Sequence, residues 1–305
     1  MPCPYDCLMN YDGDHWTFDC EPTLTDSQVV EFCREGHLLL RGVVPDEINR
    51  RTCDYLESKV KMNPSWIPEG MTNEDLERIR TTHAPSTILL EDWFVDHVLL
   101  NAPVSGAIRS LLGRDVGLPV LVSDHRCECP QEAQRWHHDA DHVFGPELNF
   151  VEVFYFPQDT PIELGPSEMA PSTHIRNSLD NPPQSGVLSD GPAGTVGILH
   201  RRSRSTAEGT RHMLKYSYWP TVPPQRDWVL EPRFNPHSAN YGGHNLARYV
   251  AHIYAWLSGK PEGVNLIGEQ GWPSRNVNDI APGYGFEARE GYLPAWRSKS
   301  PDGYA

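Results

Sequence analysis

Residues 194–219 read GTVGILHRRSRSTAEGTRHMLKYSYW and contain two short β-type runs on either side of a polar turn. The first run extends from Thr195 to His200, and the second extends from His212 to Trp219. Comparable runs occupy residues 119–129, 136–139 and 150–156. Short strands separated by Gly and Pro turns are typical of a sandwich or barrel and not of a β-α-β sheet. The sequence therefore predicts a β-rich core.

Helices are expected on both sides of this core. Thr25, Asp26 and Ser27 form a helix-start signal, and Gly36 ends the apolar stripe that follows. A strand is expected over residues 37–44, and further helices over 45–60, 92–100, 104–112 and 245–257. We predict a single domain over residues 1–305. It would comprise a helical and loop elaboration at 1–115, a core at 116–220 and a C-terminal extension at 221–305.

Charge and hydropathy narrow the function classes. The chain of 305 residues has a formal net charge of -15, which disfavours binding to nucleic acid or to anionic membranes. No apolar run approaches the roughly 18 residues of a membrane span, and residues 1–7 do not resemble a secretory signal. We therefore expect a soluble cytoplasmic protein that acts on a small molecule; the sequence does not indicate its oligomeric state.

The seven cysteines lack paired Cys-x-x-Cys spacing, so neither a disulfide framework nor a zinc ribbon is indicated. Cys127 and Cys129 alternate along an expected strand and would project to the same side. A metal site is one interpretation of this pair, but one buried face of a strand explains it and is favoured.

The segment Trp136-His-His-Asp139 contains the only His-x-Asp or His-x-Glu triplet in the sequence. Residues two apart on a strand share a face, so His137 and Asp139 can both point into a barrel while His138 points away. Two histidines and one carboxylate on one face of a metal leave three coordination positions open, as non-haem Fe(II) oxygenases require. One strand thus offers two of the three ligands.

His200 is the best candidate for the third ligand because a strand leads directly into it. Ile198 would share its face and is expected to point inward. Arg211 follows at the start of the next run, and its planar guanidinium matches a carboxylate. Lys215 lies on the same alternating face as Arg211, where a lysine at a sheet edge with its ammonium in solvent is expected. Tyr155 is expected in the core.

Several of these motifs together resemble the phytanoyl-CoA dioxygenase family of Fe(II)/2-oxoglutarate oxygenases. They are the Trp136–Asp139 segment, the later segment Gly165-Pro-Ser-Glu-Met-Ala-Pro-Ser-Thr-His174, His200 with Arg211, and the opening helix and strand from Leu24 to Pro45. The resemblance covers about residues 24 to 219. It implies a double-stranded β-helix, the cupin-like jelly roll, with flanking helices.

The resemblance also implies an activity. His137, Asp139 and His200 would bind Fe(II) as catalytic ligands, and Arg211 would bind the distal carboxylate of 2-oxoglutarate. With O2 as the second cosubstrate, a C–H bond of a small-molecule metabolite would be hydroxylated, with release of succinate and CO2. Desaturation, ring closure and epimerisation begin from the same chemistry, so the outcome stays open.

Two other functions use the same fold. A cupin-like zinc hydrolase or isomerase would use the three ligands to activate water. Arg211 disfavours it, because a hydrolase does not need a clamp for a dicarboxylate. A catalytically silent ligand-binding barrel is disfavoured by the complete ligand set.

Overall fold

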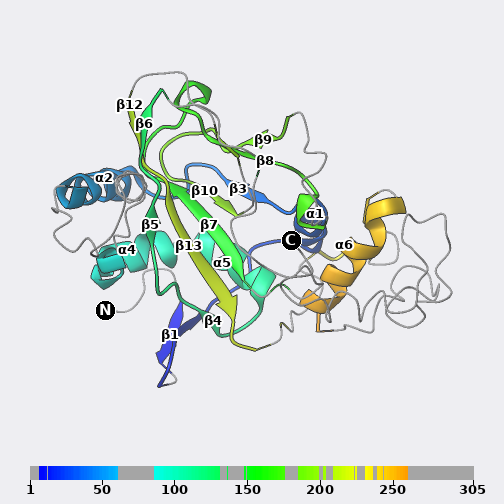
Figure 1. The fold of residues 1–305 in the computed structure, drawn as a ribbon. Coiled ribbons are helices and arrows are strands. Elements are labelled where there is room, and N and C mark those ends of the chain that lie inside the picture. The colour runs from blue at the N-terminus through cyan, green and yellow to red at the C-terminus, as the bar shows by residue number, and fades with distance from the viewer. Residues whose placement is uncertain are drawn as a thin grey trace, which may run out of the picture.

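The computed structural model describes residues 7–11, 13–60, 86–130, 136, 148, 150–175, 185–198, 202–203, 209–222, 224, 231–235, 239–242 and 244–259. The architecture below concerns these residues and is drawn in Figure 1.

The largest sheet has eight strands in the order β1-β2-β4-β13-β7-β10-β3, with β5 also paired to β13. Its strands are β1 (Leu8–Tyr11), β2 (Trp16–Asp19), β3 (Leu38–Leu40), β4 (Val116–Gly117), β5 (Ser123–Asp124), β7 (Val151–Phe156), β10 (Thr195–Ile198) and β13 (Leu214–Pro220). At its centre β7 runs antiparallel to both neighbours, so that Tyr155 is opposite Val196 on β10 and Leu214 on β13. All pairings are antiparallel, as expected for a sandwich.

A second sheet has the order β11-β8-β9 and contains β8 (Ser167–Met169), β9 (Val187–Leu188) and β11 (Arg202–Ser203). A two-stranded ribbon pairs β6 (Cys127–Cys129) with β12 (Gly209–Arg211). After β7 the chain passes to β8 and β9, returns to the large sheet at β10, crosses to β11 and returns at β13. This alternation between two sheets is the winding of a jelly roll, which confirms the predicted fold class.

The helices form where sequence signals predicted them. They are α1 (Asp26–Glu35), α2 (Asp46–Val60), α4 (Asp92–Phe94), α5 (Ala102–Leu112) and α6 (His244–Leu257), with a π-helical turn at Val95–Leu99 and short 3₁₀ turns at Ser86–Leu90, Ile162–Leu164 and Thr173–Ile175. α1 and α6 pack side by side, and α2 and α4 lie at the opposite end of the sheet (Figure 1).

α1 has a complete capping box. The Thr25 hydroxyl accepts a hydrogen bond from the Gln28 backbone N–H, and the Gln28 side chain accepts one from the Thr25 N–H. At the other end Gly36 adopts φ 77°, a left-handed conformation that glycine tolerates best. The expected helix boundaries are therefore confirmed at both ends.

The central strands β7 and β10 of the large sheet are buried on both faces. One face of β7, carrying Val153 and Tyr155, packs into the main core with the helices. The other face carries Phe154 and Phe156, which pack with Met169 of β8 and with Met213. The space between the two sheets is thus a second core, separate from the helical core, and it is where a jelly roll holds a ligand.

None of the described helices has both the length and the apolar character that crossing a membrane requires.

Candidate functional site

Of the four residues predicted to form the site, the structure describes one. Arg211 ends β12, whereas His137, Asp139 and His200 lie outside the described residues. Their roles as metal ligands therefore stay predictions. Within the described ranges no group of three or more His, Cys, Asp or Glu side chains is placed to hold a metal ion.

Arg211 is buried, with only 4% of its surface exposed. Its Nη1 donates a hydrogen bond to the backbone carbonyl of Gly165, the residue that precedes Pro166 and strand β8. Because β8 belongs to the second sheet, the guanidinium reaches from the β6–β12 ribbon toward that sheet. A cation held at this junction is suitably placed to bind an anionic ligand between the sheets.

Two sulfur-containing residues lie near Arg211, one along the chain and one across the ribbon. Met213, two residues along the chain, is fully buried and accepts a hydrogen bond at its Sδ from the Ser167 hydroxyl, at 3.5 Å. Cys127 is opposite Arg211 in the β6–β12 register. The burial of Arg211 strengthens any ion pair formed there, because fewer water dipoles screen it.

Strand β11 shows where the chain goes after His200. It begins at Arg202 and pairs with β8, Ser203 lying opposite Ser167. Ser167 follows Gly165, the partner of Arg211, by two residues. The polar segment after His200 and the guanidinium of Arg211 are therefore brought to the same end of β8.

The prediction that Ile198 points inward is wrong. Ile198 belongs to the core that packs against the helices, and its register partner is Val153, on the same helical side. Alternation failed as a guide because both faces of β10 are buried, so an apolar residue fits either face. Ile198 therefore does not support an inward-facing His200. The position of β11, just after His200 in the sequence, supports His200 instead.

The sequence suggested that Lys215 lies at a sheet edge, and this prediction is also wrong. It lies on β13 between β7 and β5, opposite Phe154, whose side chain packs between the sheets. Its Nζ is 2.9 Å from Oε1 of Glu152, and the two side chains are 16% and 8% exposed. A buried carboxylate from β7 makes this position favourable for a lysine.

A carboxylate–histidine–carboxylate array centred on the residue after Arg211 was not predicted from the sequence. His212 Nδ1 lies 2.7 Å from Oδ2 of Asp124, and its Nε2 lies 3.1 Å from Oε1 of Glu57 on α2. Burial lowers the pKa of His212, but the hydrogen bonds and charges of Asp124 and then Glu57 outweigh it and raise the pKa. The array links α2 and β5 to the segment between β12 and β13.

Tyr155, which was expected in the core, and His174 both have structural contacts. Tyr155 is fully buried in the helical core and donates a hydrogen bond to Oδ1 of Asn49, at 2.8 Å. His174 Nε2 lies 2.8 Å from the Cys33 carbonyl oxygen at the end of α1. Neither side chain contributes to the space beside Arg211.

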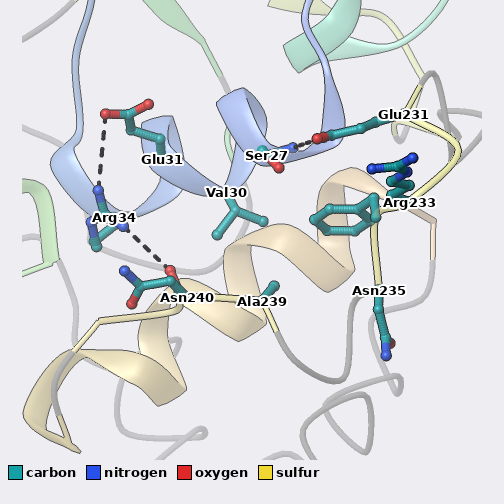
Figure 2. Close-up of a pocket in the computed structure, with 10 residues that line it drawn as sticks. Ser27, Val30, Glu31, Arg34, Glu231, Arg233, Asn235, Ala239 and Asn240 are labelled. Atoms are coloured by element: carbon teal, nitrogen blue, oxygen red, sulfur yellow. Dashed lines mark hydrogen bonds and ion pairs between the residues drawn. The ribbon is translucent and has the colours of Figure 1, made fainter.

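A pocket of about 390 Å³ lies between α1 and the segment that leads to α6. Figure 2 shows its lining: Ser27, Val30, Glu31 and Arg34 from α1, and Glu231, Arg233, Phe234, Asn235, Ala239 and Asn240 from the other side. Glu231 accepts a hydrogen bond from the Ser27 N–H, and Arg34 donates one to the Asn240 carbonyl. The pocket contains none of the predicted site residues.

Comparison with known proteins supports the fold. No family model and no curated protein matches the chain. Its structure is similar to that of EctD from S. alaskensis with 2-oxoglutarate and 5-hydroxyectoine, at 14% identity and a TM-score of 0.52, with 75% of this chain and 89% of EctD covered.

Two further structures are similar. They are the nickel complex of the non-heme monooxygenase ThoJ (15% identity, TM-score 0.49, 77% of this chain and 98% of that one) and HygX from Streptomyces hygroscopicus with nickel and 2-oxoglutarate (14%, 0.48, 70% and 95%). At such identities the likeness concerns the fold alone.

Proposed function

We propose that this protein is a non-haem Fe(II)/2-oxoglutarate-dependent oxygenase of the phytanoyl-CoA dioxygenase type. Its reaction would hydroxylate a C–H bond of a small-molecule metabolite and release succinate and CO2. The observation that carries the proposal is the buried guanidinium of Arg211 at the junction of the two sheets. It occurs in a fold shared with EctD, whose structure includes 2-oxoglutarate.

The winding of the chain supports the proposed ligands. The segment Trp136–Asp139 lies in sequence between β6 and β7, where a jelly roll needs one further strand of the second sheet. Among the described strands that sheet ends at β11, which begins two residues after His200. A strand added beside β11 would bring His137 and Asp139 next to His200, the arrangement required of a shared metal site.

Arg211 fits the distal carboxylate of 2-oxoglutarate. Its guanidinium offers two parallel N–H donors, and the Gly165 carbonyl holds one edge of the group so that the remaining donors have a fixed direction. The Arg211 side chain lies almost entirely out of contact with solvent, at 4% exposure. The chain thus supplies a fixed positive charge in a dry environment, which favours a bound dicarboxylate.

His137, Asp139 and His200 would hold Fe(II) on one face and leave three positions for 2-oxoglutarate and O2. When bound, the metal supplies the redox chemistry that couples loss of CO2 from 2-oxoglutarate to oxidation of a substrate C–H bond. The contribution of the protein is to orient the cosubstrate through Arg211 and to keep the site free of bulk water.

Anaerobic addition of Fe(II) and 2-oxoglutarate tests the proposal. The wild-type protein should develop a weak metal-to-ligand charge-transfer band in the visible spectrum, and His137→Ala and Arg211→Ala should lose it. Arg109→Leu is the matched control, because Arg109 is also a buried arginine but pairs with Asp19 near the N-terminus. Absence of the band in the wild type, with no difference among the variants, would exclude the proposed function.

A further inference from the structure

Two thiols lie beside Arg211 on the paired strand. Cys127 and Cys129 are at alternate positions of β6, so both side chains project to the same side, and their Sγ atoms are 3.7 Å apart. Neither is part of a disulfide. Cys127 is buried, whereas Cys129 is only partly buried and precedes the exposed Pro130. Packing alone does not account for a thiol that stays within reach of solvent.

The register places these thiols on the face that carries Arg211. Arg211 is directly opposite Cys127, and Gly209 is directly opposite Cys129. Residues that pair directly across two antiparallel strands project to the same side. Cys129 Sγ is 3.7 Å from the Leu164 carbonyl oxygen, and the next carbonyl, of Gly165, accepts the hydrogen bond from Arg211. The Cys129 thiol and the Arg211 guanidinium thus contact consecutive carbonyl groups of one short stretch of backbone, and the Cys127 thiol lies next to Cys129.

The side chains around Cys129 leave room for a small reagent. Gly209 has no side chain, and a methyl group added there would meet only the Leu164 side chain, at 3.5 Å. The Cys127 sulfur lies two residues before Cys129 on the same strand. A sulfenic acid formed at Cys129 would therefore lie next to the Cys127 thiol, because the two Sγ atoms are 3.7 Å apart.

We propose that Cys127 and Cys129 form a reversible oxidation site that controls binding of a carboxylate ligand at Arg211. The thiolate of Cys129 attacks hydrogen peroxide, breaking its O–O bond and giving a sulfenic acid and water once a proton is taken up. The Cys127 sulfur then attacks the Cys129 sulfur, forming the S–S bond, and water leaves. Overall two thiols are oxidised to a disulfide and one peroxide is reduced to two waters.

The disulfide would disturb Arg211 through the backbone. Bonded sulfurs are about 2.05 Å apart, so the two side chains must close the 3.7 Å gap. Residues two apart on a strand have Cα atoms about 6.6 Å apart. That spacing is near the upper end of the range seen in disulfides, so β6 must contract. Because β6 is hydrogen-bonded to β12, contraction shifts the strand that orients the guanidinium.

Formation of the disulfide does not depend on the proposed function, whereas its effect on 2-oxoglutarate does. The full-length protein is reduced with dithiothreitol, desalted and treated with hydrogen peroxide without metal. Intact mass should show the loss of two hydrogen atoms, and peptide mapping should place the link between Cys127 and Cys129. Cys127→Ser and Cys129→Ser should each abolish this link.

Cys7→Ser is the matched control. Cys7 and Cys20 are a second pair of cysteines, which flank the β1–β2 hairpin, and the β6–β12 ribbon lies at the opposite end of the molecule from this hairpin (Figure 1). Peroxide should still link Cys127 to Cys129 in this variant. Binding of 2-oxoglutarate with anaerobic Fe(II) should weaken on the order of tenfold in oxidised wild type, recover with dithiothreitol, and stay constant in Cys127→Ser.

If peroxide treatment leaves both thiols unlinked, the proposed oxidation site is wrong. A mapped disulfide with unchanged 2-oxoglutarate affinity overturns its control of Arg211. Reduced wild-type protein that does not bind 2-oxoglutarate contradicts the proposed function instead, while peptide mapping still decides the oxidation site separately.

Discussion

The ammonium Nζ of Lys215 lies 2.9 Å from Oε1 of Glu152 on the face of the large sheet that carries Phe154, where Glu152 is buried and Lys215 is half-buried. Each charge compensates the desolvation of the other. Removal of one partner leaves the other ionised in a poorly solvated place or forces it to become neutral. The pair therefore contributes to stability mainly through the cost of breaking it.

Lys215→Met should lower the free energy of unfolding by about 3 kcal/mol, because it strands the Glu152 carboxylate. The double variant Lys215→Met/Glu152→Gln should recover part of the loss, since no charge then remains buried. Urea unfolding of the wild type, both single variants and the double variant measures the coupling. Single-variant losses that simply add in the double variant would contradict an interaction between the two residues.

Stability should depend on pH through His212, whose pKa is raised by Asp124 and Glu57 despite its burial. A histidine with a folded pKa above its unfolded value of about 6.5 contributes fully below that pH. Its contribution is lost as the pH rises through the folded pKa. The difference in unfolding free energy between wild type and His212→Gln should therefore decrease as the pH rises above about 6.5.

Glu57→Gln supplies the control for this titration. It removes one of the two carboxylates that raise the pKa of folded His212, so the loss of the His212 contribution should be complete at a lower pH than in the wild type. Urea unfolding over a series of pH values measures both effects. A wild-type advantage over His212→Gln that is constant with pH would show that His212 does not change its protonation state on unfolding.

Gly36→Ala should be strongly destabilising. Gly36 has φ 77°, and a methyl group there would lie 2.2 Å from His174 Nδ1, whose ring is held by the Cys33 carbonyl. Left-handed backbone costs about 1 kcal/mol for alanine, and the overlap adds about 1–3 kcal/mol. Thermal unfolding should show a clearly larger loss than in Gly13→Ala, where φ is also positive but nothing lies within 4 Å. Equal losses would contradict the role of His174.

The sequence predicted the elements whose signals are local. α1 was predicted at both ends because Thr25 and Gly36 are chemical signals for the first and last turns. The strands β8 and β11 were not predicted, because two or three residues are too few to show a period. Their pairing is nevertheless what places the segment after His200 close to the carbonyl that binds Arg211.

Predictions about faces and partners failed where they depended on distant residues. Ile198 was assigned to the wrong face because β10 is covered by helices on one side and by the second sheet on the other. Lys215 was placed at an edge because the sequence does not reveal that Glu152 lies beside it. The burial of Arg211 agrees with the position that the resemblance implies, while its binding of 2-oxoglutarate stays a prediction.

The proposed metal ligands can be tested one residue at a time. His200 lies two residues before β11 in the sequence, and His137 and Asp139 lie in the sequence between β6 and β7, so the winding of the chain predicts that all three meet at one end of the second sheet. Each of His137→Ala, Asp139→Ala and His200→Ala should weaken Fe(II) binding by at least about tenfold, because a three-ligand site loses a donor.

The chain offers two matched controls for this ligand set. His138→Ala alters the residue that alternation directs away from the metal, and His174→Ala removes a histidine that contacts the Cys33 carbonyl. Both variants should bind Fe(II) as the wild type does, although His174→Ala should unfold more easily. Anaerobic equilibrium dialysis with a ferrous-specific chelator measures binding without requiring the substrate. If His200→Ala binds Fe(II) as tightly as His138→Ala does, the third ligand is a different residue, and only the placement of His137 and Asp139 is retained.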